Sequence, residues 1–404
     1  MEELGFVNLL VVAAIAFCAP LALGLLPGLR VPAVVAEIGL GIAVGPNGLG
    51  WVEIDAPVEI VSLLGLAFLL FLAGLELDVR QLRGRRLRLA AAGFGMSVVI
   101  ALVAAYAMQA AGLVDAPMLV AVALVATSLG VVVPVLKDAG EAGGELGQLV
   151  IAAASIADFG AIVLLSIFFT GEEGSATSQL ILLALFAALV VLVALSLSTA
   201  ERSSRLHGAL LALMDTTAQI RVRGAWLLLA GMVALAGELG LELILGAFAA
   251  GAMLAIVDRD DAMTHPLLHT KLEAAGYGIF IPAFFVVSGM RFDLGALTSS
   301  ASALAQVPLF LLALLLVRGL PTLTYRPLVG DTRARAAGLL QATSLPFIVT
   351  ATMIGAELGL VEADTAAALV SAGMLSVLLF PSAALGMLRG APSAPSAPAP
   401  HAEA

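Results

Sequence analysis

Apolar residues recur along the chain in runs of about 20 residues, the length that an α-helix needs to cross a bilayer. Short segments richer in polar residues, Gly or Pro separate these runs. The pattern therefore predicts an all-α polytopic membrane protein with about 13 transmembrane helices. The expected spans are residues 4–26, 31–50, 57–77, 88–112, 116–136, 146–170, 178–199, 222–239, 240–257, 277–296, 302–325, 335–357 and 363–388.

The composition agrees with a chain that lies in the lipid bilayer. Hydrophobic residues make up 61% of the 404 residues and charged residues 12%, about half the charged share of an average soluble domain. The single cysteine, Cys18, excludes a disulfide framework. No nucleophile–base arrangement, phosphate-binding loop or metal cluster suggests an enzyme, and no basic amphipathic stretch suggests a nucleic-acid partner.

Basic residues indicate the orientation of the spans. An odd number of spans puts the termini on opposite sides, and an outer N-terminus places the Arg-rich segment 80–88 inside. All but two of the 19 Lys and Arg residues then lie in the cytoplasm, since Arg291 falls outside and Arg318 within a span. Residues 1–390 form one transmembrane domain, and the Pro/Ala/Ser-rich residues 391–404 predict a disordered cytoplasmic tail with no room for a soluble regulatory domain.

A four-residue motif occurs twice, as Ala126-Thr127-Ser128-Leu129 and as Ala342-Thr343-Ser344-Leu345. The copies lie in the fifth and twelfth spans, which cross the membrane in opposite directions. We therefore expect two inverted six-helix repeats, about 1–171 and 222–388, joined by a linker helix at about 178–199. A chance match in so Ala-rich a chain is the alternative.

Helix-weakening residues follow both copies: Gly130 and Pro134 after the first and Pro346 after the second. Proline removes an internal hydrogen bond and frees carbonyl groups. A broken helix at membrane depth is tolerated where it is buried or lines a cavity, and freed carbonyls and hydroxyls can bind an ion there. Ordinary proline kinking remains the alternative for each helix.

A lone carboxylate, Asp158, lies in the middle of the apolar run from Leu149 to Phe169. An ionised Asp at the midplane costs about 2.5–3.5 kcal/mol on insertion scales, so such residues usually face a polar cavity. Ser155, three residues earlier, shares its helical face. The sequence predicts a cation or proton site at Asp158; a structural Asp bonded to a neighbouring helix is the alternative.

Five further motifs are similar to those of a known family. They are Val34-Val35-Ala36-Glu37-Ile38-Gly39-Leu40-Gly41 with Gly45-Pro46, the segments 71–78 and 127–137, Leu245-Gly246-Ala247-Phe248-Ala249-Ala250-Gly251, and Phe284-Phe285-Val286-Val287-Ser288-Gly289-Met290. In this order and spacing, over residues from about 10 to about 385, the chain resembles the monovalent cation:proton antiporter family 2, within the sodium/proton exchanger superfamily.

The resemblance implies a homodimer in the plasma membrane, each protomer having thirteen helices. Each protomer would hold a dimerisation domain and a mobile core with the broken fifth and twelfth helices crossed. The family exchanges Na⁺ or K⁺ for H⁺ by elevator-like alternating access. Asp158 matches its ion-binding aspartate, and Arg318 looks like the basic residue that supports the core.

One position departs from the family pattern. The residue before the aspartate is usually Asp, Asn or Gln, and here it is Ala157. Arg318 therefore lacks the carboxylate partner of two-carboxylate relatives, and a buried unpaired guanidinium is costly. Glu37 and Glu76 are the candidate substitutes. The alternatives are an Arg318 that snorkels to the headgroups and a Glu76 that lies at the membrane edge.

Competition at one carboxylate explains exchange, because burial disfavours the charged form of Asp158 and an alkali ion favours it. With one titrating carboxylate we expect electroneutral 1:1 exchange and no cofactor beyond the transported ions. A transporter of another solute and a transport-inactive ion sensor are the alternatives, and the choice between Na⁺ and K⁺ stays open. The expected ligands are oxygens of Asp158, Thr127, Ser128, Ser155, Val125 and Ala126, with Thr343, Ser344 and Pro346 on the partner helix.

Overall fold

The structure is a computed structural model that describes residues 6–25, 32–76, 84–138, 140–169, 181–182, 184–193, 219–257, 267–298 and 301–389. Within these ranges every regular element is helical. The elements are α1 (Val7–Leu25), α2 (Ala33–Val44), α3 (Ala56–Leu75), α4 (Gly84–Ala110), α5 (Pro117–Val125), α6 (Leu129–Asp138), α7 (Glu145–Phe168), α10 (Ile220–Glu238), α11 (Leu243–Val257), α12 (Leu267–Ala275), η1 (Gly276–Phe280), α13 (Ile281–Met290), α14 (Leu294–Thr298), α15 (Ala301–Gly319), η2 (Leu320–Tyr325), α16 (Arg326–Val329), α17 (Asp331–Gln341), α18 (Pro346–Glu357) and α19 (Ala363–Arg389).

The helices have the length and composition of a multi-pass membrane protein. In the described ranges, nine are long and apolar enough to cross a membrane, and shorter apolar helices cover 33–44, 117–133, 184–193 and 243–256. These segments follow the expected spans in order. The count of thirteen stays a prediction, and the tail and residues 80–83 of the loop at 80–88 lie outside the described residues.

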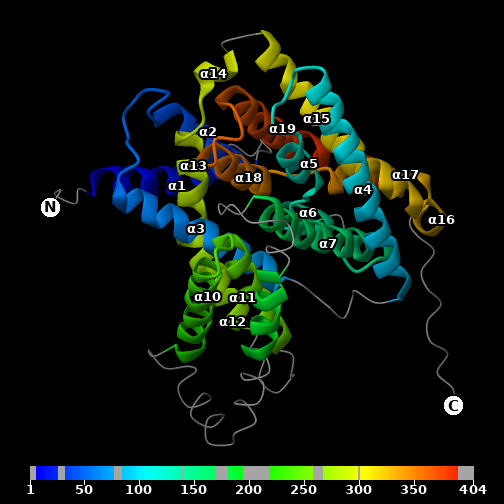
Figure 1. Cartoon of the computed structure of the whole chain (residues 1–404), viewed down its shortest axis with the longest axis horizontal. Coiled ribbons are helices and arrows are strands. Elements are labelled where there is room, and N and C mark those ends of the chain that lie inside the picture. The colour runs from blue at the N-terminus through cyan, green and yellow to red at the C-terminus, as the bar shows by residue number, and fades with distance from the viewer. Residues whose placement is uncertain are drawn as a thin grey trace, which may run out of the picture.

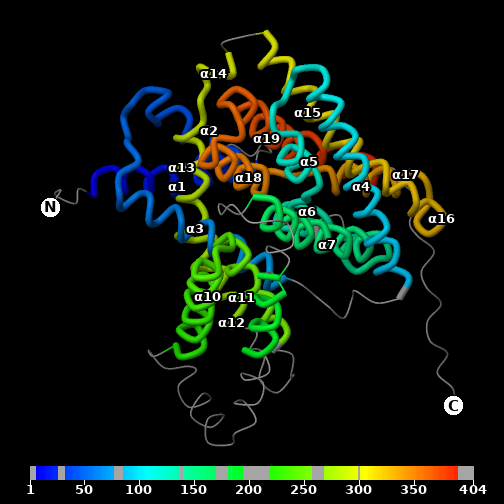
Figure 2. The backbone as a smooth tube through the Cα atoms, viewed as in Figure 1, coloured from blue at the N-terminus to red at the C-terminus, as the bar shows by residue number. Residues whose placement is uncertain are grey.

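Two groups of helices lie side by side (Figures 1 and 2). The scaffold group comprises α1–α3 and α10–α13 with η1, and the core group comprises α4–α7 and α14–α19 with η2. In the scaffold group α3 packs on α11 and α2 on α13; in the core group α4 packs on α5 and α7, and α15 and α17 pack on α19. Among the described elements, α7 and α11 make the main helix–helix contact between the groups, where the rings of Phe159 and Phe248 stack 5.6 Å apart.

Each predicted repeat contributes three spans to each group. The helices α1–α3 and α10–α13 come from the first halves of the two repeats, and the core group takes the second halves. Two equivalent halves would give this division. The repeat boundaries themselves stay a prediction.

Glycines bring the scaffold helices into backbone contact. A Cβ at Gly41 of α2 would overlap the carbonyl oxygen of Val286 in α13, and one at Gly289 would overlap that of Ile38. The same holds for Gly251 of α11 against the backbone of α3. Because the backbones touch, only small residues fit at these positions, and the scaffold helices pack as one unit.

Two helices of the core group are broken, as the repeated motif predicts. Helix α5 ends at Val125 and α6 begins at Leu129, while α17 ends at Gln341 and α18 begins at Pro346. Both breaks fall on the motif itself rather than downstream of it. Pro134 lies inside α6, whereas Pro346 occupies the first turn of α18, where its missing N–H costs nothing.

Candidate functional site

The two broken helices meet at their breaks. The N–H of Ser128 donates to the carbonyl oxygen of Thr343 at 2.9 Å, and the hydroxyl of Thr127 donates to that of Gln341 at 2.6 Å. The side chains of Thr127 and Thr343 are fully buried. Backbone groups that an unbroken helix would pair internally thus pair across the crossing, which satisfies them away from water.

Asp158 of α7 faces this crossing. The N–H of Thr127 donates to its Oδ1 at 3.3 Å, and α6 begins two residues further on, at Leu129. The carboxylate therefore lies at a helix N-terminus, whose unpaired N–H groups and dipole favour a negative charge. These donors stabilise a charged Asp158 in the middle of a membrane helix.

A cavity of about 90 Å³ opens beside Asp158. This volume has room for several water molecules or a partly hydrated ion. Its polar lining comes from both broken helices and from the scaffold group, and includes Ser128, Ser344, Glu76 and Tyr277. The cavity is therefore shared between the two groups of helices.

Ser344 has a hydroxyl whose bonding is incomplete. Its Oγ is buried and has no hydrogen-bond partner among the described residues, although the backbone of Ser344 bonds to the hydroxyl of Ser376. Burying an unpaired hydroxyl is costly. A ligand in the cavity that Ser344 lines would supply the missing partner.

Arg318 is buried in the core group, 1% exposed, and does not snorkel. Its Nε donates to the Thr127 hydroxyl at 2.9 Å, its Nη1 to Ser97 Oγ at 3.1 Å, and its Nη2 to the carbonyl of Ala153 at 3.5 Å. Neutral oxygens thus hold the guanidinium. The bonds described for Arg318 go neither to Glu37 nor to Glu76.

The other predicted site residues take different places. Glu37 is buried in α2 of the scaffold group, and Glu76 follows α3 and lines the cavity. The hydroxyl of Ser155 donates to the carbonyl of its own helix at Ile151, 2.9 Å away. Val125 and Ala126 are buried at the end of α5.

Sequence reasoning missed Ser97 and Tyr277. Ser97 lies in the apolar helix α4, and nothing in the local pattern links it to Arg318, 221 residues away. Tyr277 lies in the π-helical turn η1 between α12 and α13. A polar side chain in an apolar helix was the available signal for both.

A solved structure has the same fold. The sodium proton antiporter MjNhaP1 from Methanocaldococcus jannaschii matches with a TM-score of 0.65, over 95% of this chain and 98% of that one. At 16% identity the match shows the fold alone. The crossed, broken helices and the overall fold therefore place the chain in the antiporter-fold class of membrane proteins.

The family follows from sequence comparison. The family model described as "Sodium/hydrogen exchanger, transmembrane" matches residues 13–388, so the chain belongs to this family, as its motifs predicted. A putative Na⁺/H⁺ antiporter of Bacillus subtilis, YjbQ, is 30% identical over 94% of this chain, which spans 63% of that relative. The Na⁺/H⁺-K⁺ antiporter GerN of Bacillus cereus is 26% identical over 87% of this chain and 88% of its own length.

Proposed function

We propose that this chain exchanges a monovalent cation, Na⁺ or K⁺, for H⁺ across the plasma membrane, with both ions competing for Asp158. The main observation in support is the position of Asp158: this carboxylate of a membrane helix faces the crossing of two broken helices and lines a cavity. Family membership and relatives named as Na⁺/H⁺ antiporters support this function. Proton and cation exclude each other because both neutralise the same oxygens.

Three side chains supply the oxygens of the proposed cation site: Asp158, Ser128 and Ser344, all of which line the cavity. Hard oxygen ligands of this kind suit alkali ions. Thr127 contributes mainly by position, because its N–H holds Asp158 and its hydroxyl joins Arg318 to the crossing. Ser155 and the carbonyls of Val125 and Ala126 stay predicted ligands in a rearranged state.

We further propose electroneutral 1:1 exchange. Ala157 offers no second carboxylate beside Asp158, and neutral groups hold Arg318. Provided that Glu76, which lines the same cavity, keeps its charge, Asp158 alone carries either one proton or one monovalent cation in each crossing. Transport that sets up or follows a membrane potential in proteoliposomes would contradict this stoichiometry.

Alternating access by an elevator-like movement of the core group fits the arrangement. The cavity at Asp158 extends to Glu76 and Tyr277, at the ends of α3 and η1 that the expected orientation places in the cytoplasm. We therefore assign an inward-open state. Core and scaffold groups share few helix contacts, whereas each is tightly packed within itself. A homodimer formed through the scaffold groups, with outer N-termini and cytoplasmic C-termini, is the proposed assembly.

Proteoliposomes with an internal pH dye test the proposal, with Na⁺, K⁺, Li⁺ or choline added outside. We expect a proton flux with Na⁺ or K⁺ that falls in Asp158→Asn to the level of protein-free liposomes. Asp115→Asn, a matched change at an exposed acid between α4 and α5, should keep the flux. Flux in Asp158→Asn equal to wild type would remove Asp158 from the mechanism, and a folded wild type without flux would favour another solute or an ion-sensing role.

A further inference from the structure

A second cavity, of about 490 Å³, lies between the scaffold and core groups. Ser288 and Arg291 line it from the scaffold side, and Thr352, Met353 and Glu357 from α18 of the core. None of the described residues lines both this cavity and the one at Asp158. The expected orientation places this second cavity on the outer side, so we call it the outer cavity.

The segment between the two cavities is formed by the same two helices. Along α13, Phe285 lines the inner cavity, and Ser288 and Arg291 line the outer one. Along α18, Phe347 lines the inner cavity and Met353 the outer one. A route from Asp158 to the outer side would therefore run between α13 and α18, and a side-chain contact across this gap would close it.

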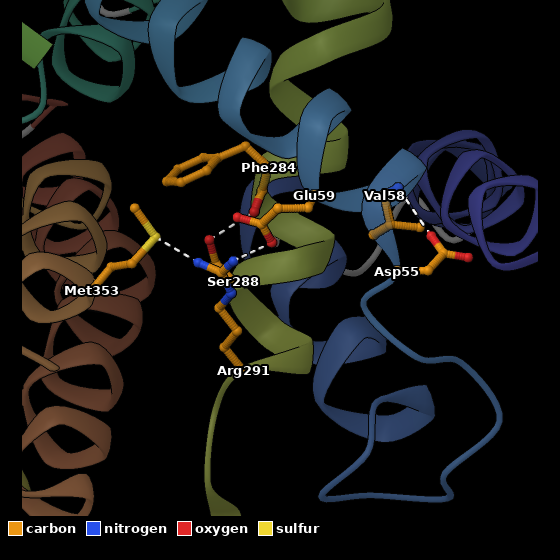
Figure 3. Close-up of polar contacts among 7 residues, drawn as sticks. All are labelled: Asp55, Val58, Glu59, Phe284, Ser288, Arg291 and Met353. Atoms are coloured by element: carbon orange, nitrogen blue, oxygen red, sulfur yellow. Dashed lines mark hydrogen bonds and ion pairs between the residues drawn. The ribbon is translucent and has the colours of Figure 1, made fainter. Parts of the chain in front are cut away.

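Arg291 makes such a contact. Its Nη2 forms an ion pair with Glu59 of α3, and its Nη1 donates to Met353 Sδ at 2.8 Å (Figure 3). Glu59 and Arg291 both belong to the scaffold group, and Met353 belongs to the core group. The guanidinium thus joins the two groups at the edge of the outer cavity.

The two bonds of Arg291 differ in strength. A bond between a guanidinium and a carboxylate is charge-assisted and strong, whereas a thioether is a weak acceptor. When the core group moves, the contact with Met353 is therefore the one that breaks, and Arg291 stays with Glu59. The paired carboxylate also offsets a positive charge that would otherwise repel a cation entering from the outer side.

From this geometry we propose that Arg291, fixed by Glu59, is the outer latch of the carrier: its contact with Met353 holds the core in the inward-open position. The inference rests on the proposed alternating access. In the outward-open position Met353 leaves Arg291 and the outer cavity reaches Asp158. Losing the latch shifts the population toward the outward-open state without removing any proposed cation ligand.

Cysteine accessibility measures this population without any need for transport. In a Cys18→Ser background, Val349→Cys probes the outer cavity and Val131→Cys the inner one. A membrane-impermeant maleimide is added to right-side-out and inside-out vesicles. Val349 is only 5% exposed in this structure, so labelling from outside requires the outer cavity to open further. While the outward-open population is small, the labelling rate at Val349→Cys from outside is proportional to it.

Met353→Leu removes the sulfur acceptor, keeps the side-chain volume and leaves the Glu59–Arg291 pair intact. Because a thioether is a weak acceptor, we expect outer labelling of Val349→Cys to rise about twofold, the low end of what one hydrogen bond contributes. Inner labelling of Val131→Cys reports the majority inward-open state and should stay almost unchanged. Arg291→Gln should give a change at least as large. Met374→Leu in α19, and Arg333→Gln, which breaks an ion pair with Glu141 within the core group, should leave both rates unchanged.

Unchanged labelling in Met353→Leu and Arg291→Gln would overturn the latch, even where Asp158→Asn confirms the antiporter. Equal shifts in the control variants would also overturn it, because the effect would then be general loosening of the core. If the wild type shows no exchange while Met353→Leu still changes the labelling, the proposed function would be refuted and the latch would stand.

Discussion

The scaffold and core groups differ in what they bury. All but two of the buried polar and charged residues that the structure describes belong to the core group; the two in the scaffold group are Glu37 and Ser62. The scaffold helices instead touch backbone to backbone through glycines such as Gly41 and Gly289. Dense apolar packing suits a part that stays still, whereas buried polar groups cost free energy unless paired. The core buries such polar groups around Asp158, where ions are expected to bind.

The largest expected effect concerns scaffold packing. In Gly41→Ala the new Cβ would overlap the carbonyl of Val286, and since that neighbour is backbone it cannot move aside. We expect a loss of about 3 kcal/mol or more, at the upper end of overpacking costs, seen as a lower melting temperature and yield in detergent. Gly39→Ala, two residues earlier with open space around it, is the control. Equal melting of both variants would mean that α2 and α13 do not need this contact.

A smaller effect is expected from the buried guanidinium of the core. Arg318→Met keeps most of the side-chain volume but removes the donors to Thr127 and Ser97. Charged hydrogen bonds contribute about 1.5–3 kcal/mol, so we expect the exchange rate to fall about 10- to 100-fold with the protein still folded. Arg318→Lys keeps the charge without the planar fork and should give an intermediate rate. Full exchange in Arg318→Met would show that Asp158 works without this support.

Ser344→Ala tests whether a buried hydroxyl of the core binds the cation or stabilises the fold. Because Ser344 Oγ has no partner among the described residues, its removal costs no protein hydrogen bond and should leave melting unchanged or slightly raised. Loss of one oxygen ligand should raise the KM for the cation about fivefold, as for one ordinary hydrogen bond. The control is Ser371→Ala, a buried serine of α19 away from the cavity. A lower melting temperature with unchanged KM would make Ser344 structural.

The sequence predicts those features of the scaffold and core that depend on neighbouring residues, and it misses those that depend on contacts between distant residues. Apolar runs predict the helices because each run must satisfy its own backbone in lipid, and the repeated motif predicts both breaks. Partners across the fold leave no local pattern: Ser97, rather than a carboxylate, completes the bonding of Arg318. Arg291 could have been singled out from the sequence, because it is the lone basic residue on the expected outer side. Its partner Glu59, 232 positions away, could not.

The smallest expected effect lies at the seam between the two groups, where two aromatic stacks can be compared. Phe248 of α11 stacks on Phe159 of the core at 5.6 Å, whereas Phe280 stacks on Phe68 within the scaffold at 5.0 Å. Such pairs contribute about 0.5–1.5 kcal/mol. Because Leu keeps an apolar contact with Phe159, Phe248→Leu should raise outer labelling of Val349→Cys only about twofold, the lower end of that range, if Phe159 moves with the core as proposed.

The matched change within the scaffold separates movement from stability. Phe280→Leu should lower the melting temperature by a similar amount and leave the labelling rate unchanged, because Phe280 and its partner Phe68 both belong to the scaffold group. Equal labelling in the two variants would mean that the seam does not lie between α7 and α11. The division into a still scaffold and a moving core would then have to be redrawn around another pair of helices.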